Sequence, residues 1–331
     1  RHIGKRCRGN AMIEAILNSL CAVAVVAVVA GVGFYFAHKG TFNEQSRALI
    51  AKLVNISLPC FLFYSVAARF THDQFMELAQ SLTLPFIVIF INFLFSILFI
   101  KIGWVAKERA GTFISCFSGS TVLFVGVPIV MAMYGERGIP YVLEYFIANC
   151  LFIWTVGLYN IQLDNVRRVG GKAPKLWSFK SIRMLFKPPL IGCALGLLCV
   201  LVSLKVPDTI MMITRYLGNL TTPLALIFVG ITVQMVGFGR LKKMPRELWL
   251  ILFACYVLRP IITYCAAQPF GLDPFMLRVF MIVSALPVSS VISVLSKAYG
   301  GDAEFAAEAI GASTAAVVFA MPVILVIVNL I

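Results

Sequence analysis

The chain has 331 residues, of which 60% are hydrophobic and 13% are charged, and its mean hydropathy is +0.94. A soluble domain is about 45–50% apolar and about 25% charged, so a water-facing globule of this composition would expose a very large apolar surface. The composition therefore excludes most classes of soluble enzyme and predicts a membrane protein.

The formal net charge of +14 comes from 28 Lys and Arg against 14 Asp and Glu. These basic residues form short clusters between apolar runs and no stripe with interleaved aromatics. We therefore assign the charge to lipid headgroups and topology, and expect no nucleic acid as a partner. The nine cysteines show no CxxC pair and no metal-ligand spacing with histidine, so we expect no metal site. The sequence also has no phosphate loop of the Gly-x4-Gly-Lys-Ser/Thr type, and we expect no cofactor.

Apolar runs long enough to cross a bilayer follow one another along the chain, separated by polar or Gly/Pro-containing segments. We predict ten spans, at residues 12–37, 48–70, 80–104, 110–134, 141–163, 185–204, 210–238, 247–270, 275–297 and 303–330. The runs are continuous and lack a period of two. The predicted fold class is therefore an all-α membrane protein with ten transmembrane helices.

These spans divide the chain into four parts. Residues 1–11 are predicted to be an extra N-terminal tail, 12–164 a first five-helix unit, 165–187 a basic cytoplasmic loop and 188–331 a second five-helix unit. The tail starts with Arg1, so we expect a mis-assigned start, with a genuine short tail as the alternative. The positive-inside rule places the basic loop in the cytoplasm and both termini outside.

Two pairs of motifs recur at nearly one offset. Asn55-Ile-Ser-Leu-Pro59 and Asn219-Leu-Thr-Thr-Pro223 share the pattern Asn-x-x-x-Pro, and residue 55 to residue 219 is an offset of 164. Tyr134-Gly135 and Tyr299-Gly300 end the fourth and ninth spans, at an offset of 165. Because five spans is an odd number, the second unit enters the membrane from the opposite face. Inverted repeats of this kind are typical of secondary transporters, which bind substrate near the midplane.

Prolines within the spans predict broken or kinked helices, because proline lacks a backbone donor and clashes with the preceding turn. Such a break is tolerated at membrane depth only inside protein or beside a water-filled cavity. The mid-span prolines that we single out as cavity candidates are Pro59, Pro128, Pro223 and Pro287. We predict broken crossing helices 4 and 9 at Pro128 and Pro287. Their exposed helix N-termini would attract an anion such as a carboxylate.

The candidate substrate-binding residues come from these interrupted spans and from the two Asn-x-x-x-Pro motifs. At the crossing of spans 4 and 9 they are Thr121, Gly126, Pro128, Pro287, Ser289 and Ser290. On the facing wall they are Asn55, Pro59, Asn219, Thr222 and Pro223. Each hydroxyl could instead bond to its own helix at a packing kink, and that alternative stays open.

Arg259 is the ionisable residue that lies deepest in a predicted span. A charge at that depth could neutralise an anionic substrate, form an ion pair with Glu308 or reach the interface by snorkelling. Neither broken span contains Asp or Glu before its terminal loop, so a carboxylate proton carrier has no obvious candidate there.

The sequence resembles the auxin efflux carriers, a family of bacterial, fungal and plant membrane transporters within the bile acid/auxin-type superfamily. The resemblance covers most of residues 12–331. Its most specific segments are Phe124-Val-Gly-Val-Pro-Ile-Val-Met-Ala-Met-Tyr-Gly135, Asn219-Leu-Thr-Thr-Pro-Leu-Ala-Leu-Ile-Phe-Val-Gly230 and residues 285–302. The short central loop is similar to that of the bacterial branch.

This resemblance implies two inverted five-helix repeats, a dimerising scaffold of spans 1, 2, 6 and 7, and a moving transport domain of the other six. It also implies a carboxylate substrate such as malate, malonate or an auxin-like acid. Thr121 stands where the family often has Asn, which leaves the substrate open.

We therefore expect a secondary transporter of small organic anions, not an enzyme, that works by alternating access in the cell membrane. We expect a homodimer, with H⁺ or Na⁺ as the candidate coupling ion. A sodium-coupled bile-acid-type symporter and a transporter-like membrane receptor or sensor remain alternatives, and a channel is a weaker one.

Overall fold

The computed structural model describes residues 24–68, 82–170, 188–236 and 244–330, and all regular secondary structure in these ranges is helical. Six helical stretches are long and apolar enough to cross a membrane: Glu44–Ala67, Thr83–Lys101, Val122–Val169, Asp208–Met235, Arg246–Phe270 and Ala303–Leu330. Shorter apolar helices are Ala24–His38, Ile191–Leu201 and Pro274–Ser284. The prediction of an all-α membrane protein is confirmed for this part of the chain, and the count of ten spans stays a prediction.

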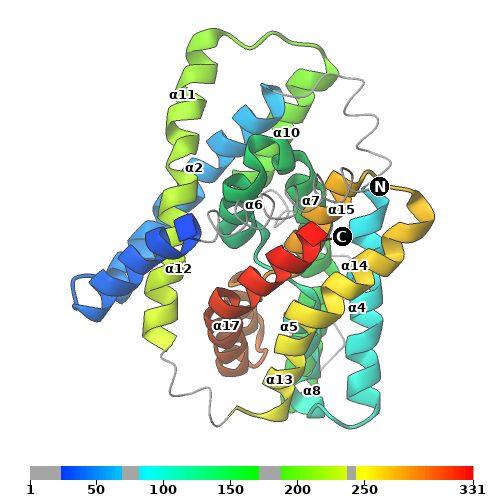
Figure 1. Ribbon diagram of the computed structural model, residues 1–331. Helices are drawn as coiled ribbons and strands as arrows, with labels where there is room; N and C mark the ends of the chain where they lie inside the picture. Colours follow the sequence, from blue (N-terminus) through cyan, green and yellow to red (C-terminus); the bar gives the residue numbers. More distant parts are fainter. Residues whose placement is uncertain (1–23, 69–81, 171–187, 237–243, 331) are drawn as a thin grey trace, which may run out of the picture.

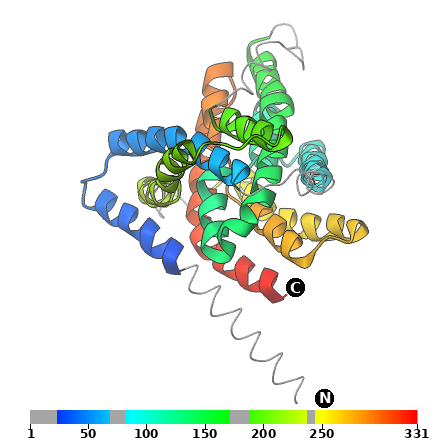
Figure 2. The same ribbon diagram turned by 90° about the horizontal axis from the view of Figure 1, so that it is seen from above.

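The helices form two groups (Figures 1 and 2). The first group packs three helices around α2: its members are α2 (Glu44–Ala67), α10 (Pro188–Leu201), α11 (Asp208–Asn219) and α12 (Thr221–Val236). Small residues allow close approach here, because a Cβ on Gly192 would lie 2.2 Å from the carbonyl oxygen of Pro59. A Cβ on Gly230 would lie 1.8 Å from the carbonyl oxygen of Ala30, so helix Ala24–His38 also belongs to this group.

The second group contains the remaining helices. They are α4 (Thr83–Lys101), α5 (Ala110–Ser118), α6 (Val127–Tyr134), α7 (Ile139–Phe152), α8 (Leu158–Val169), α13 (Arg246–Phe253), α14 (Arg259–Ala267), α15 (Pro274–Ser284), α16 (Val291–Tyr299) and α17 (Ala303–Leu330). Short 3-10 turns at Lys107–Arg109, Gly135–Gly138 and Gln268–Phe270 connect some of them. Three π-helical segments lead directly into α6, α8 and α14: η2 (Val122–Gly126), η4 (Ile153–Gly157) and η6 (Ala254–Leu258). π-helical turns of this kind are frequent at functional sites.

Two of these helices are interrupted. Helix α5 ends at Ser118 and helical structure resumes at Val122, whereas α15 ends at Ser284 and resumes at Val291. Pro287 lies in the second gap, as predicted. The first gap comprises residues 119–121 and therefore precedes Pro128, so the predicted position of that break was wrong. Pro128 lies six residues after Val122, just behind the π-helical segment Val122–Gly126, and the helical stretch continues through it to Tyr134.

The other two prolines do not interrupt their helices. Helix α2 continues through Pro59, and Pro223 lies in the first turn of α12, where no intrahelical donor is needed. The expected breaks at these positions are therefore absent, although α11 and α12 are separate helices on either side of Leu220.

The fifth predicted span is longer than the sequence suggested. Helix α8 continues to Val169, past the start of the predicted loop at residue 165. Asp164 holds this end of the helix in place, because it is buried and accepts the backbone N–H groups of Gly111 and Thr112, each at 2.7 Å. The predicted tail at 1–11 and most of the predicted loop at 165–187 lie outside the described residues.

Candidate functional site

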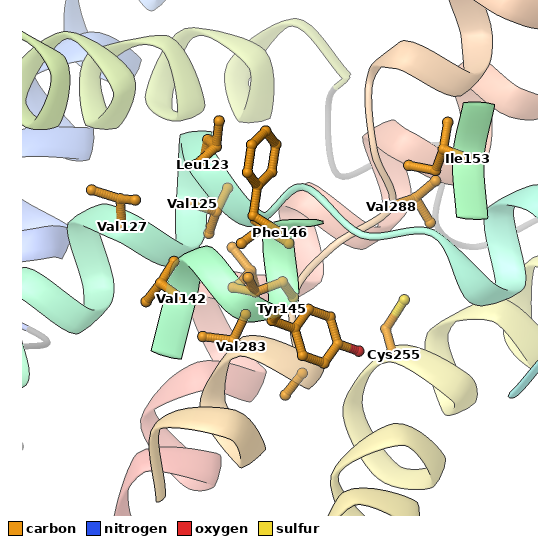
Figure 3. Close-up of a cluster of buried hydrophobic side chains, with 14 of the residues drawn as sticks. Leu123, Val125, Val127, Val142, Tyr145, Phe146, Ile153, Cys255, Val283 and Val288 are labelled. Carbon is orange, nitrogen blue, oxygen red and sulfur yellow. The ribbon is translucent and has the colours of Figure 1, made fainter. Parts of the chain in front are cut away.

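The two interrupted helices meet at their gaps. The backbone N–H of Thr121 donates to the carbonyl oxygen of Pro287 at 2.9 Å, and Ser120 and Val288 form an isolated antiparallel bridge. Backbone groups in each gap have no partner within their own helix, and here they find one in the other gap. Backbone N–H and C=O groups in an apolar interior require such partners. Figure 3 shows the apolar side chains around this crossing, among them Val288 and Phe146.

Asn149 on α7 pairs with the backbone at the crossing. Its Nδ2 donates to the carbonyl oxygen of Ser120 at 2.8 Å, and its Oδ1 accepts the backbone N–H of Ser120 at 2.9 Å. The side chain is buried. Sequence reasoning missed this residue, although an asparagine within an apolar span was a usable signal, because buried polar groups in a membrane need partners.

A cavity of about 410 Å³ lies beside the crossing. Its lining brings together the start of η2, the start of α16, both gaps, the junction of α7 with η4, and α2. The residues are Asn55, Leu58, Ser120, Thr121, Val122, Leu123, Phe124, Phe146, Asn149, Cys150, Ile153, Trp154, Ser289, Ser290, Val291 and Val294. The aromatic ring of Phe124 packs on Phe228 of α12 with centroids 5.5 Å apart, so this wall contacts the first group of helices.

None of the described lining residues carries a charge. Two helix N-termini begin at the cavity, however, at Val122 and Val291. The first turn of a helix has N–H groups without intrahelical partners, and each N-terminus carries about half a positive charge. The Oγ of Ser120 adds a buried hydroxyl that has no hydrogen-bond partner within the described residues. The side chains that line the cavity are therefore uncharged, while the two helix N-termini and the Ser120 hydroxyl supply partial positive charge and hydrogen-bond donors. Such a site suits an anion.

The structure brings four of the predicted site residues to this cavity: Asn55, Thr121, Ser289 and Ser290. Two more belong to the crossing without lining the cavity. Pro287 contributes its carbonyl oxygen to Thr121, and a Cβ on Gly126 would lie 2.7 Å from Cδ1 of Leu286.

The other five predicted residues lie away from the cavity lining. Pro128 is buried in α6, Pro59 is half-buried within α2 and Thr222 is half-buried in α12. Asn219 and Pro223 are exposed. The two Asn-x-x-x-Pro motifs still meet, but through their third positions: the hydroxyls of Ser57 and Thr221 lie 2.8 Å apart and are buried.

Arg259 is completely buried at the start of α14, directly after η6. Its guanidinium donates to backbone carbonyl oxygens of both interrupted segments. Nε and Nη2 reach Phe117 at 3.1 and 2.6 Å, Nη2 also reaches Cys116 at 3.1 Å and Gly119 at 3.4 Å, and Nη1 reaches Leu286 at 3.2 Å. Glu308, the partner considered from the sequence, is exposed, and the ion pairs among the described residues join other side chains. Arg259 therefore neither snorkels nor pairs with that carboxylate.

The chain is similar in sequence to known membrane transport proteins. The family model described as "Membrane transport protein" matches residues 18–325. An uncharacterized transporter of Methanocaldococcus jannaschii is 22% identical over 305 residues, which is 88% of this chain and 93% of that protein. A protein of Rhizobium meliloti named "Putative malonate transporter" is 27% identical over 119 residues, 36% of each chain.

Proposed function

The chain belongs to the membrane transport protein family, that of the auxin efflux carriers, and we propose that it is a secondary transporter that moves a small organic anion by alternating access. The membrane and transport parts of this statement follow from the family and from the multi-span helical structure. The substrate class and the mechanism are our proposal.

The observation that carries the proposal is the pair of helix N-termini at one uncharged cavity. A carboxylate placed there would accept hydrogen bonds from backbone N–H groups in the first turns of η2 and α16. It would also accept hydrogen bonds from the hydroxyls of Ser120, Thr121, Ser289 and Ser290. Such neutral donors hold an anion without a formal ion pair, which favours release as well as binding. The residues proposed to contact the substrate are therefore these hydroxyls together with Asn55.

Two kinds of carboxylate fit the cavity. A small dicarboxylate such as malonate or malate could use both helix N-termini, one for each charged group, and the similarity to a protein named for malonate supports this choice. The aromatic side chains of Phe124, Phe146 and Trp154 would suit an auxin-like ring. We favour the dicarboxylate, because two separate positive termini call for two negative groups.

The proposal includes ten spans in two inverted five-helix repeats. The contact of Ser57 with Thr221 supports it, because equivalent positions of two repeats meet on the axis that relates them. The interruptions in the fourth and ninth predicted spans support it as well, since each places a helix N-terminus at the same cavity.

In this mechanism, the first group of helices is the static scaffold and the site of homodimer contact, and the second group moves. The cavity lies between them, with Asn55 and Leu58 on α2 facing the crossing. Movement of the crossing past α2 would expose the anion to one side of the membrane and then the other. We propose both termini on the outer side, as the loop charges predict.

Uptake into proteoliposomes tests the proposal. Purified protein should accumulate labelled malonate or malate above protein-free vesicles, with indole-acetate as the aromatic comparison. Variants Thr121→Val and Ser289→Ala should raise KM for the transported anion without lowering the amount of folded protein. If a folded, correctly inserted protein moves none of these anions, the proposed function is wrong. If uptake occurs but neither variant changes KM, the site is wrong.

A further inference from the structure

The interrupted helices have carboxyl-terminal ends as well as amino-terminal ends, and the two kinds of end have different surroundings. The amino-terminal ends at Val122 and Val291 open on the cavity. The carboxyl-terminal end of α5 and the segment that follows α15 instead converge on Arg259. The helix dipole places about half a negative charge at a carboxyl-terminal end, so a cation there is stabilised.

The guanidinium is enclosed by these carbonyl groups. Five hydrogen bonds reach Cys116, Phe117 and Gly119 at the end of α5, and Leu286 after the end of α15. No carboxylate among the described residues forms an ion pair with it. An isolated buried charge is costly, so the carbonyl dipoles of the two broken helices must supply the compensation.

Unwound backbone carbonyls and carboxyl-terminal ends of half-helices are the groups that bind a coupling cation in ion-driven carriers. Here those carbonyls already have a cation as partner. Arginine stays protonated at all accessible pH values and is covalently attached, so it cannot be released on one side of the membrane. A metal ion at the same carbonyls would have to displace five hydrogen bonds and share a buried site with a fixed positive charge.

We propose that Arg259 is a built-in cation that replaces a coupling sodium ion at the helix crossing, and that anion movement by this chain is therefore independent of Na⁺. The statement about transport rests on the proposed function, whereas the statement about cation occupancy does not. Arg259 is a positioning residue in this account: it joins the two carboxyl-terminal ends, and the amino-terminal ends keep their relative position at the cavity as a result.

The first test uses the unaltered chain in proteoliposomes and in detergent. Replacing Na⁺ with equimolar choline should leave both the thermal unfolding temperature and the malonate uptake rate unchanged. A rise in uptake of about tenfold on adding a Na⁺ gradient, equivalent to about 1.4 kcal/mol, would overturn the proposal.

The second test removes the cation. Arg259→Ala should unfold at a lower temperature in choline, and millimolar guanidinium should raise that temperature, because the small cation can occupy the vacated carbonyl site. Arg259→Lys keeps a positive charge but lacks the planar guanidinium. Its unfolding temperature should therefore lie between those of Arg259→Ala and the unaltered chain, and guanidinium should raise it less than it raises that of Arg259→Ala. Arg278→Ala is the matched control, since Arg278 is a half-buried arginine of α15 whose Nε has no hydrogen-bond partner within the described chain.

The outcomes are distinguishable. If guanidinium stabilises Arg259→Ala no more than Arg278→Ala, the built-in cation is wrong. If Arg259→Ala does not fold, Arg259→Lys and the unaltered chain still decide the question through their responses to guanidinium and Na⁺. If guanidinium rescues the thermal stability of Arg259→Ala while the unaltered chain moves no organic anion, cation occupancy stands and the proposed function fails.

Discussion

Asn149 pairs with the backbone of Ser120 as a residue of a neighbouring β-strand would. Its Nδ2 donates to the carbonyl oxygen of Ser120 at 2.8 Å, and its Oδ1 accepts a hydrogen bond from the Ser120 N–H at 2.9 Å. A side chain thus replaces backbone partners that the interrupted helix has lost. This pairing joins α7 to the gap after α5 and holds one wall of the cavity.

Replacing this amide should damage both the fold and the site. Asn149→Leu leaves two buried backbone groups unpaired, which costs about 1–3 kcal/mol for each group, so we expect a lower thermal unfolding temperature and weak or absent anion binding. Asn160→Leu is the matched control: Asn160 is also buried on this continuous stretch, but its amide donates to Val156 of its own helix at 2.8 Å. Equal effects of the two variants on anion binding would contradict the role given to Asn149.

The hydroxyl of Ser120 should affect binding without affecting stability. It is buried, lines the cavity and has no partner among the described residues, so its removal breaks no bond in the unliganded protein. If it donates to the anion, Ser120→Ala should weaken binding by about 10-fold or more, as expected for a hydrogen bond of about 1.5–3 kcal/mol to a charged group. Calorimetric titration with malonate would measure this.

Ser118→Ala is the control for that experiment. The Ser118 hydroxyl is likewise buried and unpartnered within the described residues, but Ser118 is not among the residues that line the cavity. We expect the affinity of the Ser118→Ala variant for the anion to equal that of the unaltered chain. A loss of affinity in both variants would point to a general effect of the crossing.

Gly126 should tolerate no branched side chain. A Cβ there would lie 2.7 Å from Cδ1 of Leu286, beside the gap that contains Pro287. Gly126→Ala is expected to be mild, because the tip of Leu286 can move, whereas Gly126→Val should lower the unfolding temperature and the uptake rate. Overpacking of this kind typically costs about 1–3 kcal/mol.

A second substitution tests the cause of that effect. Leu286→Ala removes the atom that Gly126→Val would meet, so the double variant should be more stable than the sum of the two single effects predicts. Strict additivity in thermal or denaturant unfolding would mean that the two side chains do not meet.

The contact between Ser57 and Thr221 should contribute to stability within the first helix group. Their buried hydroxyls lie 2.8 Å apart, and a hydrogen bond of this type contributes about 0.5–1.5 kcal/mol. Ser57→Ala and Thr221→Val should each destabilise, with a coupling energy of similar size in the double-mutant cycle. Thr222→Val, at the neighbouring half-buried position, should show no coupling to Ser57→Ala, and a coupling there would argue against the contact.

The sequence predicted the membrane class because burial is decided by composition: a chain with so few charges can cover its apolar surface only with lipid or with itself. It also pointed to Thr121, Ser289 and Ser290 at the cavity. Those residues were accessible to reasoning because a helix interruption in an apolar span needs a cavity or protein partners beside it, and nearby hydroxyls are candidates to line that cavity.

The position of the first interruption was decided by tertiary structure. Pro128 was the local signal for a break, but the gap lies at residues 119–121, where Thr121 finds the carbonyl of Pro287 and Ser120 finds Asn149. A helix in a membrane can open only where partners from elsewhere in the chain satisfy its backbone, and those partners are not local in the sequence.

Arg259 shows the same division. Its depth in an apolar span marked it as costly and therefore of interest, but its partners are carbonyl groups rather than side chains. Those carbonyls become available only because two distant helices stop and their ends meet. The sequence thus determined that a charge lies deep in an apolar span, and the crossing of the interrupted helices decided that it is buried and what compensates it.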